Sequence, residues 1–266
     1  MSEDFLTDED GPGFIEEIEL PYEPLRRELH KYLVETRVGT FIRHPFCNNT
    51  VLDLDYCSRI HEQIDERAAQ ADECFENQDW EGYLGCIEVS LQPEWFDKDK
   101  DLFSDEQYWR LLGVAYCNQT RTTHNRRDLF DKLFRSERPG REHLMDEEER
   151  AIFARLPGEF VVYRGYADDD WNGYADGIAW TLDRRHAVWF ANRHREEENV
   201  RVIRAKVRKE DVWAYFDDGD ILLPPEKVFA TQDRRAWNEK ARAGWSDFIK
   251  KPFDIEAWLK TANSAT

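Results

Sequence analysis

The sequence lacks the patterns by which membrane, secreted and disulfide-bonded proteins are recognised. Its apolar runs all fall short of the roughly 20 residues that a membrane-spanning helix needs, so no membrane partner is expected. The first ten residues are acidic, whereas a secretory signal begins with basic and then apolar residues. The five cysteines are odd in number and contain no C-x-x-C pair, which favours reduced thiols in a cytoplasmic protein.

Metal-binding patterns and positive charge are also scarce. The seven histidines show no ligand spacing, and the consecutive side chains of Asp168-Asp169-Asp170 are poorly placed to share one ion, so we predict no metal site. Lys and Arg number 37 against 56 Asp and Glu, which gives a formal net charge of −19. That charge argues against general binding to a phosphate backbone, and it favours solubility, with basic protein partners or imitation of DNA as alternatives. A basic segment from 121 to 141 is the exception, and it fits a solvated helix face or a surface for an acidic target.

The chain does have enough apolar material for a large core. Of its 266 residues, 41% are hydrophobic and 14% are aromatic, which suits one large domain or two modest ones. Apolar residues recur at the helical spacing of three and four over 59–76, and helices are also expected over 25–34 and 235–258. A capping box formed by Asp146 and Glu149 predicts the start of another helix.

The pattern changes at Leu156-Pro157-Gly158, after which short β-rich runs replace most of the helices. One helix is expected after Asp183, which is a suitable N-cap. The strands are expected at 160–164, 178–182, 202–207, 212–216, 220–223 and 227–230. The sequence therefore predicts an α+β fold in three parts: a flexible acidic tail over 1–13, a helical lobe over 14–155 and a β-rich domain over 156–266.

Several short motifs of the second half occur in a recognisable order. They are Leu156-Pro157, Tyr163-Arg164-Gly165, Trp180-Thr181, Ala187-x-x-Phe190-Ala191 and an acidic element before Ile221-Leu222. In this order they resemble the mono-ADP-ribosyltransferase family, above all its phage and bacterial members with a YRG…SWT…A-x-x-FA signature, over about residues 145–230. The resemblance implies a split β-sandwich with NAD in its cleft, and transfer of ADP-ribose with release of nicotinamide.

The first motifs carry the NAD contacts that the resemblance implies. In the arginine–serine–glutamate branch of the family, an arginine on the first strand contacts the NAD phosphates, and Arg164, followed by Gly165, matches it. A guanidinium suits this contact because its planar fork donates two hydrogen bonds to phosphate oxygens and keeps its charge. Thr181 matches the second hydroxyl of a Ser-x-Ser/Thr motif and Phe190 an aromatic residue beside the nicotinamide, whereas Ala179 lacks the first hydroxyl. A strand-end ion pair for Arg164 and core packing for Phe190 are the alternatives.

The third motif supplies the catalytic carboxylate that the resemblance implies. The family has a glutamate just before an apolar strand, and here Asp220 takes that position with Asp218 upstream. Cleavage of the bond to nicotinamide builds oxocarbenium character on the ribose, which a carboxylate on the 2′-OH stabilises, and the upstream acid orients the incoming nucleophile. Aspartate is one methylene shorter than glutamate, and Glu226 is an alternative acid that lies out of register. The run Asp217-Asp218-Gly219-Asp220 also fits a polar turn between strands.

Two functions follow from these observations. The first is NAD-dependent mono-ADP-ribosylation of a protein or nucleic-acid target that the helical lobe recognises, and the resemblance implies a role in phage–bacterium conflict as a toxin or counter-defence factor. The second is a non-catalytic binding or inhibitor protein that keeps the fold and presents its acidic surface to a partner. The departures at Ala179 and Asp220 favour the second function. Release of nicotinamide from NAD distinguishes the two.

Overall fold

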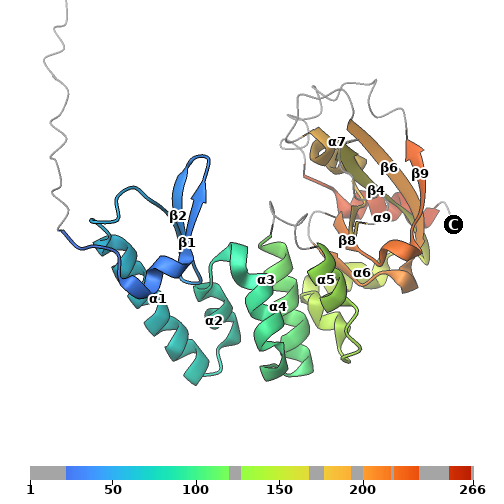
Figure 1. Ribbon diagram of the computed structural model, residues 1–266. Coiled ribbons are helices and arrows are strands. Elements are labelled where there is room, and N and C mark those ends of the chain that lie inside the picture. The colour runs from blue at the N-terminus through green and yellow to red at the C-terminus, as the bar shows by residue number, and fades with distance from the viewer. Residues whose placement is uncertain are drawn as a thin grey trace, which may run out of the picture. The chain divides into compact units, whose positions relative to one another are not determined.

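The computed structural model describes residues 22–119, 127–167, 177–192, 200–216, 219–233 and 252–264 (Figure 1). The chain forms two compact units, Met1–Gln78 and Asp79–Thr266. The fold is mixed α+β, as the sequence predicts. Within the described ranges, no helix combines the length and the apolar character that crossing a membrane requires. The acidic tail predicted at 1–13 lies outside the described residues.

The first unit combines a small antiparallel sheet with one long helix. It contains a 3-10 helix (Arg27–Tyr32), the strands β1 (Leu33–Thr36), β2 (Gly39–His44) and β3 (Cys47–Val51), and the helix α1 (Ser58–Glu76). The sheet order is β1-β2-β3, and Gly39 adopts a positive φ of 129° at the turn into β2, where glycine is favoured. The small core of this unit consists of Leu25, Leu29, Ile42, Cys47, Val51, Cys57 and Ile64.

This sheet corrects the prediction that the segment from 14 to 155 is helical. The sequence predicts a helix over 25–34, but the 3-10 helix ends at Tyr32, and Leu33 already pairs with Ile42 of β2. The three strands are four to six residues long, so their two-residue alternation is too brief to stand out beside a helical pattern. Pairing with a neighbouring strand therefore decides the local structure, because tertiary contacts override a weak helical propensity.

The second unit contains a six-stranded antiparallel sheet with helices before, between and after its strands. The helices are α2 (Trp80–Cys86), α3 (Gln92–Asp99), α4 (Asp105–Cys117), α5 (Arg127–Phe134), α6 (Glu147–Arg155), α7 (Arg184–Asn192) and α9 (Ile255–Ser264). The strands are β4 (Glu159–Ala167), β5 (Ala179–Thr181), β6 (Val200–Arg208), β7 (Ala214–Phe216), β8 (Asp220–Leu222) and β9 (Phe229–Asp233). Each strand overlaps one of the predicted runs. Most of the helix predicted over 235–258 falls outside the described residues, and α9 begins at Ile255.

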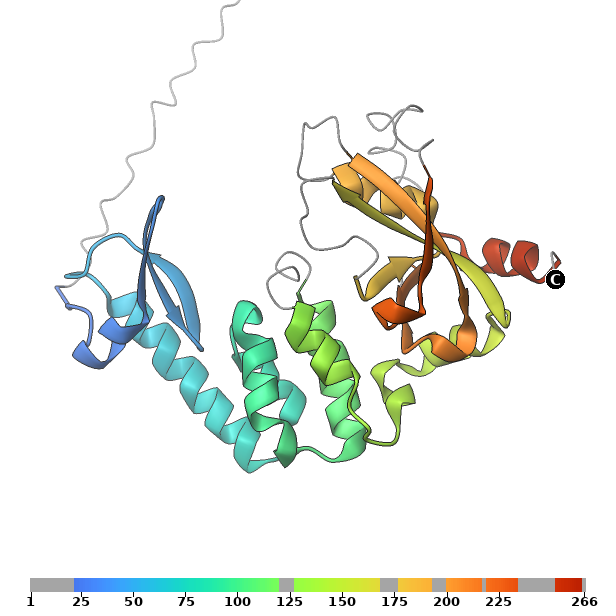
Figure 2. The ribbon, with the colours of Figure 1, turned by 45° about the vertical axis from the view of Figure 1, so that its right-hand side comes forward.

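The sheet of the second unit divides into two halves, and we call the line between them the seam. The strand order is β7-β8-β5-β4-β6-β9. β4 pairs with β6 along its whole length from Glu159 to Ala167, and the two strands run side by side in Figure 2. In the part of the chain that the structure describes, β4 pairs with β5 only where Tyr163 faces Thr181. The seam therefore separates the half β7-β8-β5 from the half β4-β6-β9.

The helices that precede the sheet share its hydrophobic core. The ring of Tyr116 in α4 stacks on Phe216 of β7 with 6.0 Å between ring centroids, and Phe134 of α5 stacks on Trp213 at 5.6 Å. The same core continues through α3 to Phe96 and through α9 to Leu259. The division between compact units therefore falls at Gln78 and Asp79, whereas the change of sequence pattern at 155 and 156 lies inside the second unit.

Candidate functional site

The three strands that carry the predicted motifs are neighbours in one sheet. Thr181 of β5 faces Tyr163 of β4 on one side and Asp220 of β8 on the other. Residues directly opposite one another in antiparallel strands project their side chains to the same face of the sheet. Thr181 and Asp220 therefore lie side by side on one face, and Arg164 follows Tyr163 at the point where the β4–β5 pairing ends.

Arg164 bridges the seam with its side chain. Its guanidinium donates a hydrogen bond of 2.5 Å to the carbonyl oxygen of Ala179 in β5. It also lies against the backbone of Gly177, because a Cβ placed there would stand only 2.1 Å from the Arg164 Cζ atom. A residue with any side chain at position 177 would displace the guanidinium. The contact with phosphate that the sequence predicts for Arg164 stays a prediction.

Gly165 allows helix α7 to approach β4 closely. A Cβ at this position would lie 1.8 Å from the carbonyl oxygen of Ala187 and 2.8 Å from the amide nitrogen of Ala191. These distances are too short for any side chain, so only glycine fits here. The glycine after Arg164 and the small residues of the Ala187-x-x-Phe190-Ala191 motif thus belong to one packing contact. This contact gives Gly165 a structural role, and it fixes α7 over the strand that carries Arg164.

Helix α7 brings a histidine to Asp220. The Nδ1 atom of His186 lies 3.6 Å from Oδ1 of Asp220, so the two can form an ion pair when the imidazole is protonated. The His186 side chain is almost fully buried, whereas that of Asp220 is 38% exposed. Sequence reasoning missed this residue, because it considered the seven histidines only as metal ligands. Its position three residues after the N-cap Asp183, on the same helix face as Phe190, was the available signal.

Phe190 presents an aromatic surface beside this pair. Its ring lies 4.5 Å from the His186 ring, centroid to centroid, with 33° between the ring planes. Phe190 is 39% exposed, so it does not belong to the buried core that was the alternative interpretation. The structure therefore brings Phe190, His186 and Asp220 together, with the aromatic ring and the carboxylate both open to solvent.

Thr181 is buried and helps to begin helix α7. Its Oγ1 atom accepts a hydrogen bond of 3.1 Å from the backbone N–H of Asp183. Asp183 in turn accepts hydrogen bonds from the backbone N–H and the guanidinium of Arg185, which anchors the first turn of the helix. The hydroxyl thus has a structural role, and its contact with a ribose stays a prediction.

Tyr116 brings helix α4 to the same site, and no local pattern in the sequence indicates this. Burial raises the pKa of the Tyr116 phenol, the negative charge of Asp220 raises it further, and the positive charge of Arg164 opposes the rise. The phenol therefore senses both charges and stays protonated through the physiological range. Its ring stacks on Phe216, the residue that faces Asp220 across β7 and β8.

Gly219, the residue directly before Asp220, is held in place from two sides. Gly219 has a positive φ of 86°, and a Cβ there would lie 2.8 Å from the ring of Phe253. Its carbonyl oxygen accepts a hydrogen bond of 2.8 Å from the N–H of Leu182. Asp218, the predicted upstream acid, lies outside the described residues. The alternative acid Glu226 forms an ion pair of 2.7 Å with Arg135, so it is engaged in a contact between structural elements.

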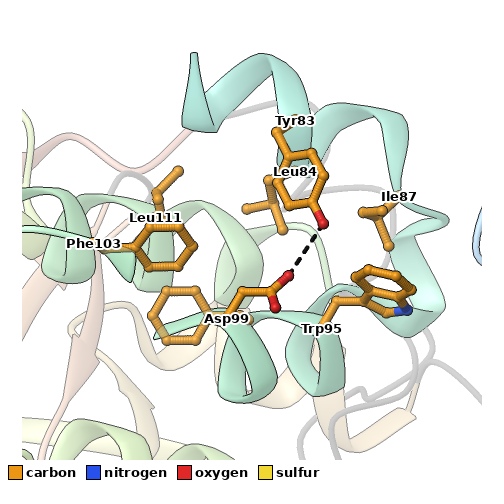
Figure 3. A pocket seen from close by; sticks show the side chains of 8 residues that line it. Tyr83, Leu84, Ile87, Trp95, Asp99, Phe103 and Leu111 are labelled. Carbon is orange, nitrogen blue, oxygen red and sulfur yellow. Dashed lines mark hydrogen bonds between the residues drawn. The ribbon is translucent and has the colours of Figure 1, made fainter. Parts of the chain in front are cut away.

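The described segments contain no cluster of metal-binding side chains. No group of three or more His, Cys, Asp or Glu residues is placed to hold a metal ion within them. A pocket does lie between α2, α3 and α4, where Tyr83 donates a hydrogen bond of 3.1 Å to Asp99 (Figure 3). Its free space is no larger than a water molecule, and its lining is otherwise apolar, so it offers no room for a substrate.

Comparison with known proteins adds no further assignment. The chain matches no protein-family model, no curated protein and no solved structure at a significant level of similarity.

Proposed function

We propose that this protein is an NAD-dependent mono-ADP-ribosyltransferase that modifies a macromolecular target. The observation that carries the proposal is that Arg164, Thr181 and Asp220 lie on the adjacent strands β4, β5 and β8. These residues come from three separate motifs, and the resemblance assigns all three to one NAD site. The division of the sheet at the seam supports the proposal, because the resemblance implies a split β-sandwich with NAD between its parts.

The side chains at the seam suit the chemical groups of NAD. A guanidinium on Arg164 matches a diphosphate, since it is planar, permanently charged and able to donate paired hydrogen bonds. The exposed carboxylate of Asp220 can accept a hydrogen bond from a ribose hydroxyl, and the exposed ring of Phe190 can pack against a flat nicotinamide. The donor, the acceptor and the aromatic surface therefore come from β4, from β8 and from helix α7, which packs on β4.

The proposed reaction is a substitution at the ribose. The bond between C1′ and the nicotinamide nitrogen breaks, and nicotinamide leaves with the electron pair while positive charge develops on the ribose. Asp220 stabilises this charge through the 2′-OH, because a fixed carboxylate near a developing oxocarbenium ion lowers the barrier. A nucleophile of the target then forms the new bond to C1′ and gives up its proton to water. Protein and nucleic-acid acceptors both fit this scheme.

The setting of the reaction is also part of the proposal. The cysteine pattern and the acidic sequence favour a cytoplasmic protein. The resemblance to phage and bacterial members favours a role in conflict between them, as a toxin or counter-defence factor. The helices of the second unit, which share a core with the sheet, would present the target to the seam.

Nicotinamide release and transfer of labelled ADP-ribose test the proposal. The full chain is incubated with biotin-labelled NAD and a bacterial lysate, and free nicotinamide is quantified. We expect Arg164→Ala and Asp220→Asn to reduce both signals about a hundredfold or more, as loss of a charge-stabilising group does. Arg43→Ala in β2 and Asp72→Asn in α1 change exposed residues of the same types and should leave both signals unchanged.

A wild-type protein that neither releases nicotinamide nor labels any component would contradict the enzymatic function. The non-catalytic binding protein would then be the better explanation. Two features of the site favour that outcome: the aspartate at position 220 is shorter than the family's glutamate, and Ala179 has no hydroxyl. Recovery or increase of activity in Asp220→Glu would show that the reach of the carboxylate limits the reaction.

A further inference from the structure

We propose that His186 is the positioning residue that holds the Asp220 carboxylate toward the seam, in place of the hydroxyl that Ala179 lacks. This inference rests on the proposed function, in which Asp220 acts on the ribose. The family motif has a hydroxyl at the first position of Ser-x-Ser/Thr, where it orients the carboxylate or the ribose. A methyl group cannot do so, and the structure places an imidazole nitrogen 3.6 Å from the carboxylate instead.

The position of His186 is determined by backbone contacts that do not involve Asp220. The carbonyl of Ala187 packs against Gly165 of β4, so α7 cannot slide along the strand without a clash. The hydrogen bond from the Asp183 N–H to Thr181 fixes the start of the helix relative to β5. His186 thus projects from a helix that is attached to both halves of the sheet. A rigid supporting residue of this kind is what a catalytic group requires to keep its geometry.

The imidazole ring itself is also held in place. It packs against Phe190 at 4.5 Å and lies 5.8 Å from the ring of Trp189, centroid to centroid. The ring is almost fully buried, whereas the carboxylate is exposed, so His186 approaches Asp220 from the protein side and leaves the solvent side open. One carboxylate oxygen then faces the imidazole, and the substrate side of the group stays accessible.

A single contact with His186 can position the carboxylate of an aspartate effectively, because that side chain is short. Its carboxylate is fixed by two side-chain dihedral angles, one fewer than in glutamate, so a single partner restricts most of its freedom. When it is protonated, the imidazole also favours the ionised carboxylate that the reaction needs. Among the surrounding groups, Asp183 and Arg185 of α7 form an ion pair of 2.8 Å with one another, and the charges of Asp220 and Arg164 both act on the phenol of Tyr116.

The first test measures the pair directly and does not depend on catalysis. The ring signals of all seven histidines are followed by NMR across a pH titration of the full protein, and the His186 signal is identified by its loss in His186→Gln. In Asp220→Asn we expect the His186 pKa to fall by about one pH unit, since an anion within about 4–6 Å stabilises the protonated ring. His30, in the first unit, serves as the internal control and should not change. An unchanged His186 titration would overturn the proposal.

The second test separates positioning from packing. His186→Phe keeps an aromatic ring against Phe190 and removes the nitrogen, whereas His186→Gln keeps a polar donor near the carboxylate. For nicotinamide release, we expect His186→Phe to lower kcat about tenfold or more with the KM for NAD changed less than about twofold, and His186→Gln to recover part of the loss. Thermal unfolding of both variants confirms that they are folded, and His30→Ala is the control for histidine substitution.

The outcomes distinguish this inference from the proposed function. Full activity in His186→Phe, with an active wild type, would overturn the positioning role and leave the enzymatic function standing. An inactive wild type would overturn the enzymatic function and with it any role of His186 in the reaction, although the NMR titration would still report the contact with Asp220.

Discussion

Arg135 of α5 donates two hydrogen bonds to the Glu226 carboxylate, at 2.8 and 2.7 Å, and so ties a helix to the turn that precedes β9. This pair joins residues 91 positions apart in the sequence. It also explains why Glu226 is unsuited to replace Asp220 at the seam. Both side chains are about half exposed, so solvent screens their attraction.

The Arg135–Glu226 pair predicts a pH-dependent contribution to stability. The hydrogen bonds from Arg135 lower the pKa of Glu226 from 4.5 to about 2. A carboxylate with a lowered pKa in the folded state stabilises the protein above its unfolded pKa, and this stabilisation is lost as the pH falls from about 4.5 toward 2. We expect Glu226→Gln to lower the free energy of unfolding by about 0.5–1 kcal/mol at pH 7, after allowance for exposure. Urea unfolding should show that difference vanish near pH 2, and Glu137→Gln, an exposed change, should show none.

Gly165→Ala is expected to destabilise the second unit strongly. The new Cβ would collide with the backbone of α7 at Ala187, and backbone atoms cannot move aside as a flexible side chain can. We expect a loss of about 3 kcal/mol or more, in the range of severe overpacking. Gly85→Ala in α2 is the matched control, since nothing lies within 4 Å of its Cβ, and it should be neutral or stabilise by up to about 1 kcal/mol. Equal stabilities of the two variants by chemical denaturation would contradict the close approach of α7.

Gly177→Ala separates the position of Arg164 from the stability of the fold. The three atoms nearest to its Cβ would all belong to the guanidinium of Arg164, the end of a long side chain that can move away. We therefore expect a cost of less than about 1 kcal/mol in unfolding free energy. The KM for NAD should nevertheless rise about as much as in Arg164→Lys, because the guanidinium no longer lies at the seam. A variant with wild-type KM would show that Arg164 does not need this position.

Tyr116 is expected to stay protonated where ordinary tyrosines ionise. Its pKa is raised by burial and then by Asp220. In an alkaline titration followed at the absorbance of tyrosinate, Tyr116→Phe should match the wild type up to about pH 11, since Tyr116 does not ionise in that range. A lower tyrosinate signal in Tyr116→Phe near pH 10 would contradict this environment for the phenol.

The strands of the second unit follow well from the sequence, and those of the first unit do not. In β6, apolar Ile203, Ala205 and Val207 alternate with Arg204 and Lys206, and β4 contains the apolar run 160–163, so the sequence indicates both strands. The strand β3 contains Asn48, Asn49 and Thr50 in a run of five residues, and asparagine has low strand propensity. Such a strand forms because it pairs with β2, and the residues of β3 alone do not reveal that pairing.

The candidate site shows the same division between local and distant information. Arg164, Thr181 and Asp220 each belong to a short motif, so the sequence alone brings them to notice. His186 and Tyr116 join them only through packing: α7 docks on Gly165, and α4 shares the core of β7. Tyr116 precedes Asp220 by about a hundred residues, and no spacing rule connects positions so far apart.

The hydrogen bond from Arg164 to Ala179 has a consequence for how position 164 can vary. Where β4 and β5 diverge, the Arg164 side chain donates the hydrogen bond to the Ala179 carbonyl that a backbone N–H would donate if the strands stayed paired. Arg164 therefore has two roles: it donates a hydrogen bond within the sheet, and it is proposed to bind the diphosphate of NAD. Lysine can fill the first role, since its ammonium donates to a carbonyl, but it lacks the flat fork for the second. Arg164→Lys should thus keep the link between β4 and β5 and weaken only the binding of the diphosphate.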